Sequence, residues 1–273
     1  MRIHSSSIAV AATLLALLAM PAYAQYGAKP ISGSPEPLGE NYRVEAQVGL
    51  WGPTPDIVVS SSALGRIGST ISAVDDLGIN KKQLPDLRFV LKPGRKHKFR
   101  IAYLPASWTA DKIVTRDIEF NAQLFRVSLP VQSEVEWKEW SFGYEYDFVS
   151  NNKGFGGLFV DLKYPTVNVT LTSLAVGTEF TQAKAPVPTI GGVGRIYATP
   201  IIAVNFELTL LKIPQIENYK ASFIDWDLAG LFNVNKNFAA RVGFRSMNVN
   251  YVFDLDTGDM KLRGLYFAGV ARF

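Results

Sequence analysis

The chain has 273 residues, of which 48% are hydrophobic and 19% are charged, and it contains no cysteine. This composition is that of a folded protein rather than a disordered one. Its 28 basic and 24 acidic residues give a formal net charge of +4, an excess too small to indicate nucleic-acid binding. The absence of cysteine excludes a disulfide scaffold, a thiolate zinc site, a cysteine nucleophile and a lipid anchor on cysteine.

The first segment has the features of a secretory leader. Arg2 precedes an apolar run over residues 8–19, and the four residues before position 25 end in an A-x-A pattern. These features predict a signal peptide over residues 1–24, cleaved between Ala24 and Gln25. The apolar run is shorter than the roughly 20 residues that a helix needs to cross a bilayer. We therefore expect an exported protein.

The rest of the chain divides into a tail and one domain. Residues 25–40 are rich in proline and glycine, which predicts a flexible periplasmic tail. Residues 41–273 show no shift of composition and no helical spacing of apolar residues, so we expect a single domain. No later stretch is apolar enough for a membrane-spanning helix, so any membrane-spanning part must consist of strands.

The dominant pattern in this domain is alternation of apolar and polar residues with period two, which indicates β-strands. Pro165 lies inside one alternating run and predicts a bulge there. Eight strands would follow if the glycine-rich run and a neighbour were misread. The ten predicted strands cover residues 42–51, 84–92, 97–104, 140–148, 158–171, 188–198, 202–211, 223–233, 238–251 and 261–273.

The connections between these strands alternate strictly between short and long. This arrangement predicts an all-β fold, an antiparallel up-and-down transmembrane barrel with an even strand number, short periplasmic turns and long outer loops. The long connections contain alternating segments of their own, at 56–60 and 113–120, which favours strands that project above the bilayer. The short connections are 93–96, 150–153, 199–201 and 234–237, and the long ones are 52–83, 105–132, 173–187, 212–222 and 253–260.

Periodicity alone does not tell which face of the wall points inward, because a soluble barrel such as a lipocalin would place its apolar face inside. Export and the strongly aromatic apolar faces favour an outer-membrane barrel with a charged lumen. A ten-stranded barrel lined by both signs of charge should be filled by its own side chains. We expect Asp225 and Asp227 to pair with Arg241 or Arg245 on the next strand. The predicted lumen network is Glu45, Arg88, Arg100, Glu145, Asp147, Asp161, Lys163, Arg195, Glu207, Asp225, Asp227, Arg241 and Arg245.

The last strand, residues 265–273, resembles the C-terminal signature of bacterial outer-membrane β-barrel proteins. It ends in Phe273 and carries apolar residues at every second position before it. The resemblance implies a small single-domain barrel, with Tyr266, Phe267 and Phe273 forming the signal that the barrel-assembly machinery recognises. It also implies the lipid bilayer and lipopolysaccharide as partners. The resemblance identifies a class of protein and no particular function.

Known enzymes among small outer-membrane barrels, such as omptin proteases, lipid A deacylases, palmitoyltransferases and phospholipases, resemble one another in needing a histidine. This sequence has two, of which His4 lies in the predicted leader and His97 at a predicted periplasmic turn. A base at that turn cannot serve an active site among the outer loops, so we expect no enzyme. Paired acids such as Asp75 and Asp76 leave room for an unrecognised carboxylate chemistry.

Two further polar clusters have simple interpretations. Arg95, Lys96 and Lys98 predict a periplasmic rim that either contacts anionic headgroups or only keeps the turn polar. The acidic run from Asp254 resembles a calcium loop but has Leu265 where the bidentate glutamate should stand. We therefore expect neither a metal site nor a cofactor.

These features favour a non-enzymatic, self-plugged barrel that acts as a structural or surface-binding platform through its long outer loops. The alternative is a narrow, charge-lined channel for small solutes.

Overall fold

The computed structural model describes residues 40–64, 66–216, 219–253 and 256–273. The predicted signal peptide and all of the predicted tail except Glu40 lie outside these residues. In the part of the chain that the structure describes, no helix has the length and apolar character needed to cross a membrane.

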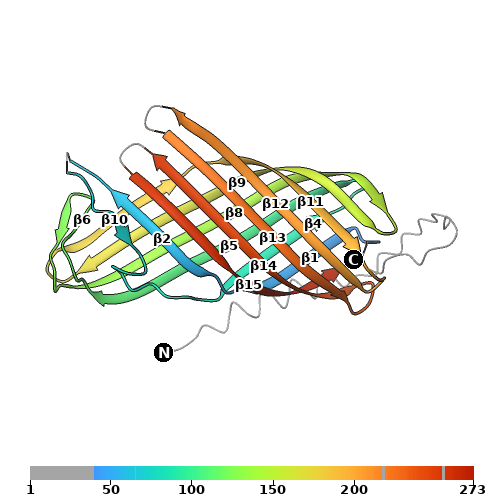
Figure 1. The fold of residues 1–273 in the computed structure, drawn as a ribbon, viewed down its shortest axis with the longest axis horizontal. Helices are drawn as coiled ribbons and strands as arrows, with labels where there is room; N and C mark the ends of the chain where they lie inside the picture. Colours follow the sequence, from blue (N-terminus) through green and yellow to red (C-terminus); the bar gives the residue numbers. More distant parts are fainter. Residues whose placement is uncertain (1–39, 65, 217–218, 254–255) are drawn as a thin grey trace. The chain divides into compact units, whose positions relative to one another are not determined.

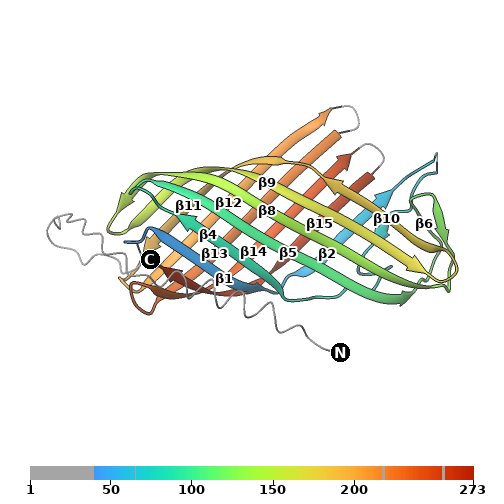
Figure 2. The ribbon, with the colours of Figure 1, turned by 180° about the vertical axis from the view of Figure 1, so that it is seen from behind.

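Ten antiparallel strands close into a barrel, since the last strand pairs with the first (Figure 1, Figure 2). The strand number of ten is thereby confirmed over the alternative of eight. In order around the wall the strands are β1 (Val44–Trp51), β4 (Leu84–Leu91), β5 (His97–Ile113), β8 (Pro130–Asn151), β9 (Gly154–Ser173), β11 (Val187–Tyr197), β12 (Ile202–Ile216), β13 (Tyr219–Asn233), β14 (Phe238–Phe253) and β15 (Asp256–Arg272).

The two ends of the barrel differ. At one end, which we call the short-turn end, tight turns join β4 to β5, β8 to β9, β11 to β12 and β13 to β14. Phe273 ends the chain there, and its carbonyl accepts hydrogen bonds from the backbone N–H groups of Arg43 (2.7 Å) and Val44 (2.9 Å). At the opposite, long-hairpin end, β5 continues to Ile113 and β8 begins at Pro130, so much of the predicted outer loop is strand.

The wall is interrupted twice at the long-hairpin end. After Trp51 the chain passes through Gly52 and Pro53 and continues as β2 (Thr54–Ser61) beside the outer part of β15. β10 (Gly177–Lys184) folds back on β9, and the chain then passes Ala185 and Pro186 before it resumes as β11. Pro53 and Pro186 lie at these two breaks, and a proline has no N–H to donate to a ladder at its own position. The minor strands are β3 (Ile71–Ser72), β6 (Ile118–Phe120) and β7 (Gln123–Phe125).

The bulge predicted at Pro165 is wrong. β9 runs through this residue with unbroken pairing to β8, from Tyr164 opposite Trp140 to Thr166 opposite Lys138. The register shift between these two strands lies instead near the short-turn end of β8. Most of the apolar side chains of β9 point outward before Pro165 and inward after it. This change of face comes from a change in the surroundings of the strand, because its backbone pairing continues through Pro165.

The short-turn half of the barrel carries a belt of exposed apolar side chains, so we call it the belt half. On β9 these are Leu158 (58% exposed) and Leu162 (47% exposed), and every barrel strand contributes others. Aromatic rings lie at the border of the belt, where Tyr103 and Trp140 stack with their centroids 4.3 Å apart. Such a continuous apolar surface on a closed barrel fits the hydrocarbon layer of a membrane.

The long-hairpin half, which we call the core half, has the opposite polarity. Its outward positions on β8 are Glu134, Glu136 and Lys138, while its interior is a packed apolar core. Within segment 62–83, residues 71–79 pack into this interior and bury Leu77 against the wall, with Trp108 of β5 in the same cluster. The core half is thus organised like a water-soluble protein, with its apolar side chains inside.

Candidate functional site

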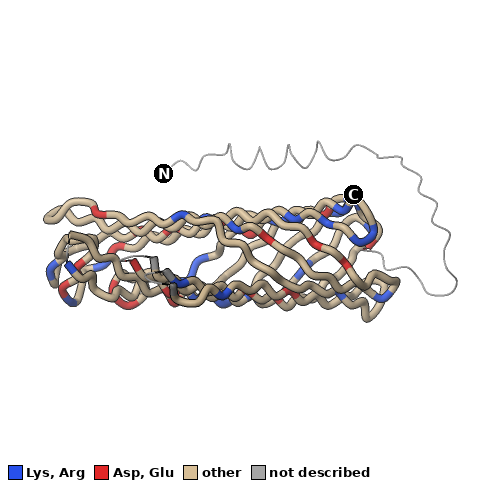
Figure 3. Tube along the Cα trace, turned by 90° about the horizontal axis from the view of Figure 1, so that it is seen from above, with Lys and Arg blue, Asp and Glu red and all other residues tan. Residues whose placement is uncertain are grey.

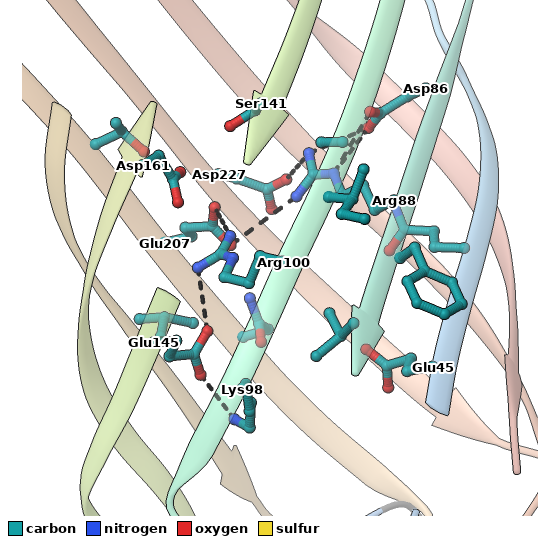
Figure 4. Close-up of a pocket in the computed structure, with 18 of the residues that line it drawn as sticks. Glu45, Asp86, Arg88, Lys98, Arg100, Ser141, Glu145, Asp161, Glu207 and Asp227 are labelled. Carbon is teal, nitrogen blue, oxygen red and sulfur yellow. Dashed lines mark hydrogen bonds and ion pairs between the residues drawn. The ribbon is translucent and has the colours of Figure 1, made fainter. Parts of the chain in front are cut away.

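The lumen of the belt half holds all thirteen charged residues predicted for it, on the inward faces of nine strands. Figure 3 shows both signs of charge interspersed along the barrel strands, and Figure 4 shows the labelled side chains pointing toward one another. Alternation brings them together, because inward positions recur at every second residue of each strand.

Asp227 of β13 is the centre of this network. It accepts hydrogen bonds from Arg88 Nη2 (3.2 Å), Arg241 Nη2 (3.1 Å) and the Tyr266 hydroxyl (2.8 Å). Arg88 also pairs with Asp86 at 3.1 Å on its own strand. Because β4 and β13 are not neighbours in the wall, the contact between Arg88 and Asp227 crosses the lumen.

A second ion pair lies one step closer to the core half. Arg245 Nε and Nη2 hold the Asp225 carboxylate at 3.0 and 2.7 Å, a bidentate arrangement that fixes both groups. Arg245 also lies 3.7 Å from Asp86. Each of the two aspartates of β13 is therefore paired with an arginine of β14, the strand on which the sequence analysis sought their partners.

Toward the short-turn end, Arg100 joins Glu145 (3.1 Å) and, across the lumen, Glu207 of β12. Lys98 binds Glu145 at 2.7 Å and Asp147 at 2.9 Å. The placement of Lys98 on the periplasmic rim is therefore wrong, because its side chain is buried inside the barrel and only 1% of the residue is exposed. Its position on β5 shares the parity of Arg100, which directs both side chains inward.

The short-turn mouth is filled by a third group of ion pairs. Arg272 bonds to Glu45 and to Asn233 (2.7 Å). Arg195 Nη1 lies 2.8 Å from Glu40, whose carboxylate also accepts the Tyr197 hydroxyl at 2.8 Å. Glu40, predicted as the last residue of the tail, is therefore held by the barrel.

Aromatic faces cover several of the lumen cations. Lys98 Nζ lies 3.3 Å from the ring centroid of Phe155, and the Arg100 guanidinium lies 4.1 Å from that of Phe159. A ring face attracts a cation, and this attraction strengthens when water is excluded. Where the lumen meets the core half, Lys163 pairs with Glu139 at 3.1 Å. Asp161, nearby on β9, forms no ion pair among the described residues.

This arrangement leaves little free space. The cavity between these groups has a volume of only about 80 Å³. Within the described residues, no three histidine, aspartate or glutamate side chains are grouped so that they could hold a metal ion. Chemically, the lumen is filled mainly by ion pairs, while some single side-chain atoms, such as Asp161 Oδ1 and Arg241 Nε, have no hydrogen-bond partner among the described residues.

Sequence reasoning missed several members of the network. Asp86, Glu139 and Arg272 all lie inward and are at most 3% exposed. Asp86 shares the parity of Arg88, which was a usable signal, and Arg272 was hidden within the apolar terminal strand.

The terminal strand splits between the two faces of the wall. Phe267 points outward and is 59% exposed, and Phe273 at the chain end is 40% exposed. Tyr266 points inward to Asp227. The role of these three residues as an assembly signal stays a prediction.

The remaining polar predictions lie at the two ends. Arg95 and Lys96 are exposed in the short turn, next to His97, whose Nδ1 lies 2.5 Å from the Tyr144 hydroxyl. Glu134 and Glu136 of β8 point outward, whereas Glu139 points inward. Asp254 lies outside the described residues.

No protein-family model matches the chain, and no curated protein matches it. Among solved structures, the chain is similar to the outer membrane protease OmpT from Escherichia coli, with a TM-score of 0.58 and 9% identity over 86% of this chain and 97% of that chain. It also matches OprG from Pseudomonas aeruginosa (TM-score 0.40, 8% identity, 86% and 99% covered). Ail of Yersinia pestis matches with a TM-score of 0.37 and 9% identity, over 83% and 99% of the two chains. The likeness to OmpT is one of fold alone: the chain has the fold of an outer-membrane β-barrel.

Proposed function

We propose that this chain is a non-enzymatic outer-membrane protein with a closed lumen, which uses the core half outside the cell as a binding platform. The apolar belt and the closed ladder support membrane insertion, because hydrocarbon accepts only structures whose backbone groups are all paired internally. The short turns then face the periplasm. The bilayer, lipopolysaccharide and, during insertion, the barrel-assembly machinery are the expected partners.

The observation that carries this proposal is the set of ion pairs that cross the lumen. The pairs of Arg88 with Asp227 and of Arg100 with Glu207 join strands that are not neighbours in the wall. A solute could pass only if such pairs separated, and each separation would leave buried charges without partners. The free volume of about 80 Å³ suits a few water molecules rather than a solute path.

Two observations bear on the competing functions. His97, the one histidine among the described residues, lies at the short-turn end, remote from the core half. This placement supports a function without a histidine base. The lumen is nevertheless lined by both signs of charge throughout, and this favours a narrow channel as the second candidate.

Single-channel conductance of the refolded protein in a planar bilayer tests the proposal. We expect no steady openings from the wild-type chain. A variant that combines Arg88→Ala with Arg100→Ala removes the guanidinium groups that cross the lumen, and it should conduct. Silence of the wild type alongside openings of the variant supports a plugged barrel. Steady openings of the wild type would instead make the chain a channel.

A further inference from the structure

A cavity lies in the wall of the core half, outside the charged lumen. Its volume is about 400 Å³, within the range of pockets that bind small molecules. It opens because two strands separate. β11 and β12 pair no further outward than Ile190 opposite Leu210. Beyond this point β10 pairs with β9 and the outer part of β12 pairs with β13, so no ladder joins them.

The pocket interior is apolar. Side chains from β8, β9, β12, β13 and β14 line it, together with the residues at the break between β10 and β11. Trp137 is buried, with only 3% of its surface exposed, and its indole N–H has no hydrogen-bond partner among the described residues. The Glu139–Lys163 pair lies at the inner end, where the pocket meets the lumen. The principal apolar lining residues are Trp137, Val167, Leu211, Phe223 and Val249.

The rim of the pocket carries positive charge. Lys184 at the end of β10 and Lys220 of β13 line it and are exposed, and neither makes an ion pair with any described residue. The opening begins directly above Ile190 and Leu210, which are outward belt residues with 58% and 41% exposure. A molecule could therefore enter where the apolar belt ends, at the outer surface of the membrane.

We propose that this pocket binds a free single-chain amphiphile with an anionic headgroup, of the fatty-acid type. The alkyl chain lies against Trp137 and Phe223, and the headgroup contacts Lys184 and Lys220. Burial of an alkyl chain supplies the affinity, and the two lysines supply the preference for a negative charge. This assignment rests on the proposed function, because it names a ligand for the core half of a closed barrel.

The test measures retention of tritiated dodecanoate by the full mature protein in phosphatidylcholine nanodiscs, with empty nanodiscs subtracted. Ala221 lines the pocket on β13, so Ala221→Phe should fill it and weaken dodecanoate binding by about tenfold or more. Ala183→Phe narrows the same pocket from the opposite side and serves if the first variant does not fold. Unchanged binding by a folded variant would show that the ligand does not occupy this pocket.

The headgroup is tested by a double variant, Lys184→Gln with Lys220→Gln. It should weaken dodecanoate binding roughly threefold to tenfold and leave dodecanol binding unchanged. The matched control, Lys153→Gln with Lys236→Gln, removes the same charge at the short-turn end and should change neither. An equal loss for dodecanol and dodecanoate would overturn the anionic assignment.

A further experiment tests whether the bound alkyl chain belongs to a free amphiphile or to a membrane lipid. Part of the phosphatidylcholine is replaced with phosphatidylglycerol. Displacement of dodecanoate would show that a membrane lipid, and not a free amphiphile, is the occupant, and it would overturn this ligand. Failure of the proposed function is distinguishable, because conductance reports on the lumen and amphiphile retention on the wall pocket. A conducting barrel that still retains dodecanoate contradicts only the closed lumen.

Discussion

The belt half and the core half of this barrel share most of their strands but have opposite polarity. On β5, Lys98 and Arg100 point inward in the belt half, whereas Leu104 and Trp108 point inward in the core half. The same alternate positions point inward along the whole strand, but the side chains at these positions change from charged to apolar. The comparison teaches that a long transmembrane strand meets two environments, hydrocarbon and then water, so its apolar face moves from the outside to the inside.

The two interiors are therefore held together by different forces. In the belt half, charged side chains offset the cost of their burial by pairing with one another. In the core half, removal of apolar surface from water supplies the stabilisation. The belt-half interior should be sensitive to loss of a charge, and the core-half interior to loss of volume.

The largest effect is expected for Asp227→Asn in the belt half. The change leaves Arg88 and Arg241 without their shared anion, and breaking a buried pair costs about 3–5 kcal/mol. Denaturant unfolding of the refolded protein in detergent measures the loss. Asp111→Asn, at an exposed position of β5, is the matched control and should unfold like the wild type. Equal stability of the two variants would contradict the role of the network.

A comparable loss in the core half is expected for Leu77→Ala. Leu77 is 1% exposed in segment 62–83, and such a truncation costs about 2–5 kcal/mol through lost burial and the cavity left behind. The loss should appear first as faster proteolysis of segment 62–83, because Leu77 is one of the side chains that pack this segment into the core. If proteolysis is unchanged, the apolar core does not hold the segment.

The outer surface offers a direct test of where the polarity inverts. Leu162 and Thr170 both point outward on β9, on either side of Pro165. Leu162→Lys places a charge in the hydrocarbon close to its aromatic border, so it should cost less than the roughly 2–4 kcal/mol expected at the bilayer centre but more than a change on the water-facing side. Thr170→Lys should be nearly neutral, because its side chain faces water. Folding yield into lipid vesicles compares the two, and equal yields would place both positions in the same environment.

The smallest effect concerns Asp76 in segment 62–83, whose carboxylate accepts Arg116 Nε (2.9 Å) and Nη2 (2.7 Å). These hydrogen bonds hold the pKa of Asp76 below its usual value. The lowered pKa stabilises the segment above the unfolded pKa of about 3.9, and this is lost as the pH falls through the folded pKa.

An ion pair at this exposure contributes about 1 kcal/mol or less, since Arg116 is 44% exposed at its side chain. Proteolysis of segment 62–83 should therefore accelerate modestly below about pH 4 in the wild type. Asp76→Asn should proteolyse faster at neutral pH and lose that step. A variant that retains the step would assign it to another acid.

Local pattern was sufficient for the belt half of the wall. Alternation of residues such as Phe99, Arg100 and Ile101 predicted the ten strands, and parity placed thirteen charged residues in the lumen. The same parity was available for Asp86 and Lys98, whose inward positions were overlooked or assigned to the rim. The pairing of Asp225 with Arg245 was also accessible, because both lie on consecutive strands.

Closure of the barrel decided the rest. The partners of Arg88 and Arg100 across the lumen depend on which distant strands face each other, and this follows from strand number and stagger rather than from any local pattern. The continuity of β9 through Pro165 and the pocket between β10 and β12 depend on the same geometry. The sequence by itself determined the strands and the parity of their faces, because side-chain alternation is local. Only the tertiary structure decided the cross-lumen pairs, the inversion of polarity and the gap in the wall, because these require strands far apart in the chain to meet.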